Sequence, residues 1–230
     1  MDGDRDRLST THWNGMPLLA IGMNRICVLD PLSSAHCLKF ERPASQRAGA
    51  SLRRRLRLWR SRLDTRLGDN GTELRAMALL DAAPGGATAP FARSLDRVAT
   101  PWGPALRCEC VRLPDGSPAH SLHAHLYTVR RYPAHVLYDA VDRFEAWLLA
   151  SGLPLFDLNP GNFVVVPCDT GVRLVCVDAK SLVRGKELIP LSRWSPALRR
   201  RKIKRRLARL RARIARVSCP PATALHCSQV

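Results

Sequence analysis

The residues best suited to chemistry lie in the stretch 153–180, where polar side chains interrupt apolar runs. A polar loop carries Asp157 and Asn162, and the second of the two apolar runs that follow it ends at Asp178. Carboxylate and amide oxygens are the ligands that Mg²⁺ prefers, and phosphoryl transfer uses one carboxylate near the acceptor hydroxyl and another at the metal. The pattern therefore indicates a metal–phosphate site. Taken without Asp178, the loop residues are more typical of a simple turn, because Asn-Pro-Gly is a strong turn sequence.

Sequence periodicity predicts an α+β fold around this loop. Residues 134–151 carry apolar side chains at helical spacing and predict an amphipathic helix that ends just before it. Two β-rich runs separated by PCDTG predict a hairpin directly after it. The remaining predicted elements are strands from Pro17 onward and three helices, over residues 51–67, 72–82 (capped by Thr72) and 197–216.

The net charge of +18 is concentrated in two of these segments. Residues 51–67 hold seven Arg and one Asp, and residues 193–216 hold twelve Lys or Arg and no acid. The rest of the chain holds as many acidic as basic side chains. Such helices could simply be solvated faces, but a field this strong also suits an anionic membrane surface or a phosphate-bearing substrate. Nucleic acid is a less favoured partner, because the basic segments contain no known nucleic-acid-reading motif.

Composition also bears on the compartment. No apolar run reaches the roughly 18 residues of a membrane span, and residues 1–20 lack the long apolar region of a secretory signal. The eight Cys include no CxxC pair, which favours free thiols in a reducing compartment. We therefore expect a cytoplasmic protein, which its basic segments could hold at the inner membrane as a peripheral protein.

The loop and its surroundings resemble the catalytic machinery of the protein-kinase-like fold. The similarity rests on D-x-N-P-x-N followed by V-D, on AHCLKFE as the strand of an ATP-binding lysine, and on TELRAM as the helix of its partner glutamate. The segment AIGMNRICVLDP resembles a shortened nucleotide loop. The resemblance implies an α+β, two-lobed kinase-like fold with a reduced C-terminal lobe.

More narrowly, the chain resembles the PhoP regulatory network protein YrbL family of bacterial kinase-like proteins. Pieces such as HCLKFE, ELRAMALL and FDLNPGNFVVV follow one another in family order from about residue 17 to about residue 206. The division that this implies is a flexible tail over 1–14, an N-lobe over 15–112 that contains both 51–67 and 72–82, and a reduced C-lobe over 113–230 that contains 155–180 and 197–216.

The resemblance implies a nucleotide site with ATP and Mg²⁺ as cofactors. Gly22 and Arg25 would lie near the phosphates. The other implied roles are contact with the α- and β-phosphates by Lys39, support of that lysine by Glu73, orientation of the acceptor hydroxyl by Asp157, and Mg²⁺ coordination by Asn162 and Asp178.

Two departures from the kinase pattern leave alternatives open. Glycine after the metal-binding acid is replaced by Ala179-Lys180, and the nucleotide loop keeps only Gly22. Only 52 residues follow Asp178, too few for the helical subdomain that grips protein substrates. The sequence thus favours phosphoryl transfer to a small, envelope-related or glycolipid acceptor. The alternatives are a catalytically silent kinase-like regulatory module and a basic nucleic-acid-binding protein.

Overall fold

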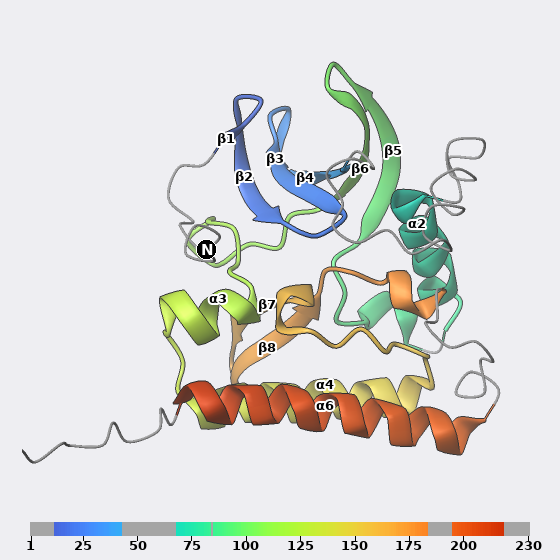
Figure 1. The fold of residues 1–230 in the computed structure, drawn as a ribbon, viewed down its shortest axis with the longest axis vertical. Coiled ribbons are helices and arrows are strands. Elements are labelled where there is room, and N and C mark those ends of the chain that lie inside the picture. The colour runs from blue at the N-terminus through green and yellow to red at the C-terminus, as the bar shows by residue number, and fades with distance from the viewer. Residues whose placement is uncertain (1–11, 43–67, 84, 184–194, 219–230) are drawn as a thin grey trace, which may run out of the picture.

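The computed structural model describes residues 12–42, 68–83, 85–183 and 195–218. The fold is mixed α+β, as the sequence predicts, with a six-stranded antiparallel sheet at one end and a pair of long helices at the other (Figure 1). The predicted basic helix over 51–67 lies outside the described residues. Within the described residues, no helix is both long enough and apolar enough to cross a membrane.

The six strands are joined by hairpins, except where β4 pairs with β6. The sheet order is β1-β2-β3-β4-β6-β5, and every pairing in it is antiparallel. His12 and Trp13 belong to the first strand, so the tail predicted over 1–14 is wrong at these two residues. The strands are β1 (His12–Trp13), β2 (Met16–Ile21), β3 (Arg25–Asp30), β4 (Ser33–Glu41), β5 (Ser94–Thr100) and β6 (Gly103–Glu109).

Strand β4 shows how the sheet directs its side chains. Successive side chains of a strand point to opposite faces. Leu38 and Phe40 pack with the apolar side chains of one face, whereas Cys37 packs with those of the other. Lys39 shares the second face with Cys37, and helix α2 (Asp69–Asp81) lies against that face. Strand alternation therefore turns a lysine inward, toward a helix.

Helix α2 starts earlier than its sequence predicts. It begins at Asp69 after an N-cap at Gly68, so the predicted capping role of Thr72 is wrong. The Thr72 hydroxyl instead donates to the Gly68 carbonyl from within the first turn. Asn70 fixes that turn to the sheet, because its Nδ2 donates to the Lys39 carbonyl at 3.0 Å. The helix then buries Glu73 together with the apolar residues Ala76, Met77 and Leu80.

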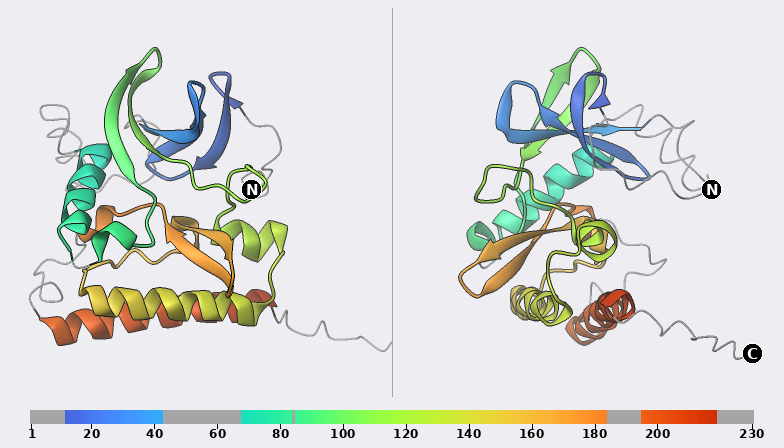
Figure 2. Two further views of the ribbon diagram at one scale, coloured as in Figure 1. Left: turned by 180° about the vertical axis from the view of Figure 1, so that it is seen from behind. Right: turned by 90° about the vertical axis from the view of Figure 1, so that its left-hand side faces the viewer.

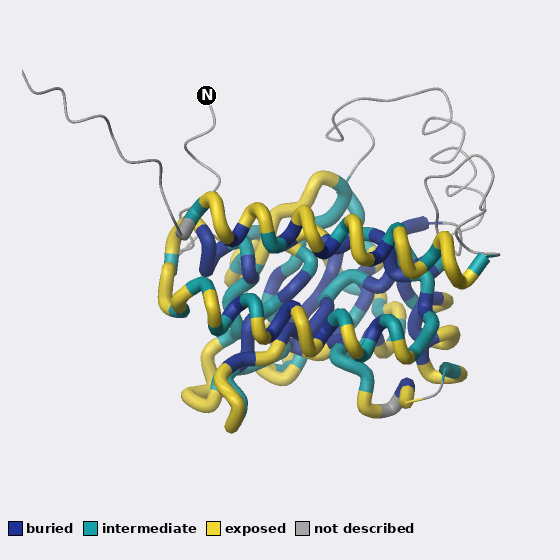
Figure 3. The backbone as a smooth tube through the Cα atoms, turned by 90° about the horizontal axis from the view of Figure 1, so that it is seen from below, coloured by how far each residue is buried: buried dark blue, intermediate teal, exposed yellow. Residues whose placement is uncertain are grey.

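The other end of the molecule is built on two long helices packed side by side (Figures 1 and 2). Helix α4 (Ala134–Ser151) has the predicted bounds, and α6 (Pro196–Ser218) extends the predicted helix slightly at each end. Their apolar stripes are buried toward the interior, and exposed residues follow the outer sides (Figure 3). The predicted hairpin forms β7 (Phe163–Cys168) and β8 (Gly171–Cys176). The short elements are α3 (Leu122–Ala124), the π-helix η4 (His125–Val129), and the 3₁₀ turns η3 (Gly86–Thr88), η5 (Pro160–Asn162) and η6 (Lys180–Leu182).

The chain just before β5 ties the two ends together. Cys176, the last residue of β8, donates its N–H to the Pro90 carbonyl at 2.8 Å and accepts from the Ala92 N–H at 2.9 Å. The segment after β8, which contains Asp178, is therefore held at a fixed place below the sheet. Described cysteines such as Cys37, Cys108 and Cys176 are buried free thiols, in line with the sequence.

Candidate functional site

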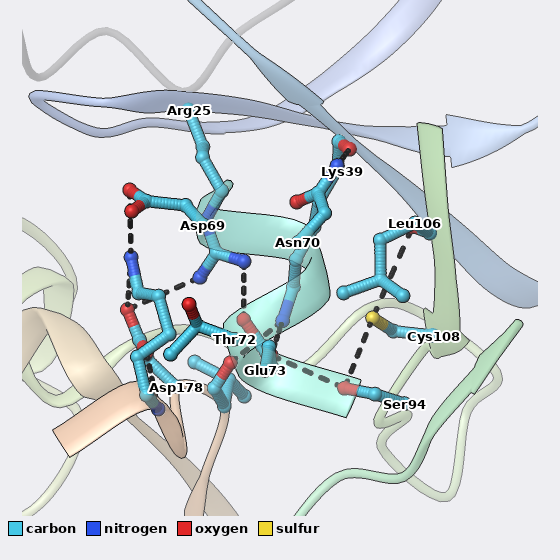
Figure 4. A network of polar contacts seen from close by, with 12 residues as sticks. Arg25, Lys39, Asp69, Asn70, Thr72, Glu73, Ser94, Leu106, Cys108 and Asp178 are labelled. Carbon is cyan, nitrogen blue, oxygen red and sulfur yellow. Dashed lines mark hydrogen bonds and ion pairs between the residues drawn. The ribbon is translucent and has the colours of Figure 1, made fainter. Parts of the chain in front are cut away.

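A buried ion pair joins the sheet to helix α2. The ammonium of Lys39 lies 2.6 Å from Oε1 of Glu73 and also donates to the Val177 carbonyl at 2.7 Å (Figure 4). The Glu73 side chain is 1% exposed and accepts a further hydrogen bond from Ser94 Oγ at 3.2 Å. The structure thus brings together the lysine and the glutamate that the sequence interpretation pairs. Ser94 and the Val177 carbonyl, which complete this contact, have no recognisable signal in the sequence.

Arg25 enters the same network from the first position of β3, directly after the turn that follows β2. The Gly22 N–H donates to the Arg25 carbonyl at 2.8 Å, which closes a tight hairpin turn. A Cβ atom at position 22 would lie 3.3 Å from that carbonyl oxygen, so the close turn favours glycine. The Arg25 guanidinium pairs with Glu73 through Nη1 and with Asp178 Oδ2 through Nη2, the latter at 3.1 Å. The sequence interpretation places Arg25 near phosphates but does not foresee these two carboxylate partners.

Asp178 receives two cations on one oxygen. Its Oδ2 lies 3.1 Å from Arg25 Nη2 and 3.1 Å from Lys180 Nζ. Its Oδ1 accepts the backbone N–H of Lys180 at 3.1 Å. Burial alone would raise the pKa of Asp178, but Arg25, Lys180 and Lys39 lower it to about 2. The carboxylate is therefore ionised at neutral pH and held by basic side chains.

Asp69 extends the network to a third acid. The Lys180 ammonium lies 3.4 Å from Asp69 Oδ2, in the first turn of α2. Burial would raise the pKa of Glu73, yet Arg25 and Lys39 lower it below its ordinary value. Sequence reasoning missed Asp69, because the expected helix began after it. The network consists of three cations and three anions, Arg25, Lys39, Lys180, Asp69, Glu73 and Asp178.

Asp157 and Asn162 lie beside this network rather than inside it. Asn162 Nδ2 donates to the Asp157 carbonyl at 2.9 Å, and the Asp157 carboxylate accepts from Asn159 Nδ2. The Asn162 carbonyl accepts the N–H of Val177 at 2.9 Å, and the Asp157 N–H donates to Ser181 Oγ at 3.1 Å. Within the described ranges, the loop reaches the segment 177–181 through these contacts and not through the Asp157 carboxylate.

The predicted metal ligands, Asn162 and Asp178, can be tested against this geometry. Asp178 is the only carboxylate of the pair, and its Oδ2 already contacts two cations. A divalent ion on that oxygen would meet strong repulsion, because like charges a few ångströms apart in a partly buried site are poorly screened. Among the described residues, no three His, Cys, Asp or Glu side chains are grouped so that they could hold a metal ion. With Arg25 and Lys180 in these positions, the residues do not fit a divalent ion at Asp178.

Comparison with models of protein families gives no match to the chain, and no curated protein gives a significant match.

Proposed function

We propose that this chain is a kinase-like nucleotide-binding protein of the YrbL type. The main support is the buried contact of Lys39 with Glu73, made directly beside Asp178 and the Val177 carbonyl. Burying charged side chains is costly unless they are paired and hydrogen-bonded. Hydrophobic packing alone would not require a lysine here. Its ion pair with Glu73 holds it at a defined place between the sheet and the rest of the molecule. In this proposal the sheet with α2 forms the N-lobe, and the remainder forms a reduced C-lobe.

The nucleotide phosphates would lie between the β2–β3 turn and the segment after β8. Lys39 would contact the α- and β-phosphates, with Glu73 holding its ammonium in place. The turn at Gly22 brings backbone and the Arg25 guanidinium to the same region. A planar guanidinium recognises phosphate well, because its N–H groups form a fork. Asp157 would orient the hydroxyl of an acceptor, if phosphoryl transfer takes place.

We assign any transfer activity to a small-molecule or envelope-related acceptor, which includes lipid-linked molecules. The exposed basic side chains of α6, which packs along α4, would attract a phosphate-bearing acceptor of this kind.

A second candidate function is a silent module that binds nucleotide and regulates without turnover. It is favoured by the contacts of Asp178, whose carboxylate is occupied by Arg25 and Lys180. It is favoured also by the local hydrogen bond that engages the Asp157 carboxylate. Measurement of ATP turnover separates the two candidates, since only the first predicts phosphate release or transfer.

The outer face of α6 is proposed to bind an anionic surface. Its apolar residues Ile203, Leu207, Leu210 and Ile214 are buried against the body of the protein. The exposed basic residues of the helix are Arg200, Arg201, Lys204, Arg205, Arg209, Arg213 and Arg216. Because these apolar residues pack inside the protein, the outer face would bind an anionic membrane by charge alone, without insertion. The membrane would be the inner membrane, at its inner leaflet. Nucleic acid is the less favoured partner.

Isothermal titration of ATP tests the nucleotide site. Lys39→Met should lower the affinity for ATP by about tenfold or more, because it removes a positive charge beside the proposed phosphates, whereas Asp178→Asn should raise it by a similar factor, because it removes a negative charge there. The matched controls are Lys204→Met and Asp139→Asn, which make the same substitutions at exposed positions of α6 and α4. Binding that is unchanged in both site variants, or changed equally in the controls, would remove Lys39 and Asp178 from the site.

A further inference from the structure

Arg25 and Lys180 stand where the sequence predicts a metal ion. Both reach Oδ2 of Asp178 at 3.1 Å, and the Lys180 N–H occupies Oδ1 at 3.1 Å. Figure 4 shows the Arg25 side chain reaching down from the sheet, between α2 and the segment that carries Asp178. Most of the hydrogen-bonding capacity of this carboxylate is therefore taken by protein groups.

The charges of the network balance without any added ion. Its three basic and three acidic side chains leave no net charge among them. A divalent ion would add positive charge next to two cations, whereas loss of Arg25 alone would leave the group one charge negative. The same holds for Lys180, so the charges of Arg25 and Lys180 at Asp178 Oδ2 keep a further cation from this place.

Arg25 is held there by the sheet and not by its side chain alone. Its residue pairs with Glu41 of β4, and its carbonyl closes the turn to Gly22 at 2.8 Å. The Arg42 N–H donates to the Asn24 carbonyl at 2.8 Å, which fixes the same turn from the other side. A guanidinium has five N–H donors, and the contacts with Glu73 and Asp178 use Nη1 and Nη2. The side chain remains 10% exposed, so an anion can still approach it.

We infer that Arg25 and Lys180 replace a divalent metal ion at Asp178, so that the phosphates of a nucleotide bind here without metal. The phosphate half of this inference rests on the proposed nucleotide-binding function. The exclusion of metal follows from the ion pairs themselves and stands apart from it. Nucleotide binding would then be insensitive to chelators, and any positive charge that the phosphates need would come from the chain.

Binding of Mn²⁺ to the protein alone tests the exclusion of metal, with the free ion followed by electron paramagnetic resonance. Wild type and Arg25→Lys should show no site that depends on Asp178. Arg25→Gln should gain one such site, and so should Lys180→Gln, which serves as a second variant if the first folds poorly. The control is Arg107→Gln, which breaks an arginine–aspartate pair with Asp96 elsewhere in the sheet. A Mn²⁺ site in wild type that Asp178→Asn abolishes would overturn the inference, and so would Gln variants that gain none.

ATP binding in the presence of a chelator or of Mg²⁺ tests the phosphate half. The wild-type affinity should differ by less than about twofold between the two conditions, and Arg25→Gln should bind at least about tenfold more tightly with Mg²⁺ than without it. Wild-type binding that requires Mg²⁺ overturns the inference while leaving the proposed function intact. Absence of nucleotide binding under both conditions overturns the proposed function together with the phosphate half, and the Mn²⁺ measurement then decides the metal half alone.

Discussion

Replacing Glu73 with Gln should destabilise the protein more than any other single change in the ion-pair network. Glu73 is 1% exposed and pairs with two cations, Lys39 at 2.6 Å and Arg25. Gln keeps the size of the side chain but removes its charge, which leaves two buried cations without their shared anion. Removing one partner of a buried ion pair costs about 3–5 kcal/mol. That is a large share of the roughly 5–15 kcal/mol by which a domain is stable.

Lys39→Met provides the comparison that makes this prediction specific. It leaves Glu73 paired with Arg25, so the carboxylate keeps a cation. The loss should therefore approach that of a charged hydrogen bond, about 1.5–3 kcal/mol. Because the two residues are in contact, the double variant should cost less than the two single variants together, with a coupling of about 0.5–3 kcal/mol. Glu73→Gln should cost more stability than Lys39→Met, because it leaves two buried cations without their shared anion, whereas Lys39→Met leaves a carboxylate that still has one cation.

Urea unfolding, followed by circular dichroism, measures these differences. Equal slopes of free energy against urea concentration are required before the free energies are compared. Asp139→Asn, at an exposed position of α4, should lie within about 0.5 kcal/mol of wild type. The reasoning is refuted if Glu73→Gln is as mild as Asp139→Asn, or if Lys39→Met is the more damaging change.

Two further predictions concern His125 and α6. His125 is buried, with Nδ1 unpartnered among the described residues, and burial first, then His120 and Arg131, lowers its pKa from 6.5 to about 4. The unfolded chain binds the proton more readily, so the contribution of His125 to the free energy of unfolding should fall by up to about 3 kcal/mol as pH drops from 6.5 to 4 and change no further below that. His125→Asn should flatten this part of the stability–pH curve in urea titrations, and an unchanged curve would assign the effect to other groups. For α6, co-sedimentation with anionic vesicles should fall steeply with salt, and Arg205→Gln with Arg209→Gln should weaken it. Equal binding to neutral vesicles, or binding that is insensitive to salt, would contradict an electrostatic surface contact.

The spacing of apolar residues along the sequence predicts the helices and strands that bury one side. The stripe that includes Leu137, Val141, Phe144 and Leu148 predicted α4 at its observed bounds, because one apolar side of a helix must be buried. Leu106, Cys108 and Cys110 alternate in the sequence with Arg107 and Glu109, a pattern typical of a strand with one buried face, and in β6 and the residue after it all three are buried. Here the period of the sequence and the burial in the fold carry the same information.

Such patterns do not predict where helix α2 begins. Gly68, Asn70 and Gly71 are residues typical of a helix end rather than of a helix start. In the structure the first turn is stabilised instead by tertiary contacts, from Asn70 Nδ2 to the Lys39 carbonyl and from the Asn70 N–H to Glu41 Oε1 at 2.7 Å. Contacts with a distant strand outweigh the low helix propensity of these residues.

Some residues of the candidate site are indicated by short sequence motifs, and others are brought into it only by the fold. The ordered set of short motifs indicated Lys39, Glu73 and Asp178 as neighbours, and the structure brings them together. The contact of Arg25 with Asp178 spans 153 positions of the chain, so nothing in either local sequence could reveal it. Lys180 was a visible signal, since it follows Asp178 closely, but its bridge to Asp69 depended on where α2 begins.

The most direct test of the nucleotide site is an experimental structure of the protein with a non-hydrolysable ATP analogue, prepared in chelator. The account predicts phosphate oxygens within hydrogen-bonding distance of Lys39 Nζ and of the Arg25 guanidinium, between the β2–β3 turn and Asp178, with no metal ion. An analogue bound on the basic face of α6, or one that leaves the contacts of Lys39 and Arg25 with Glu73 and Asp178 unchanged and lies away from them, would contradict it.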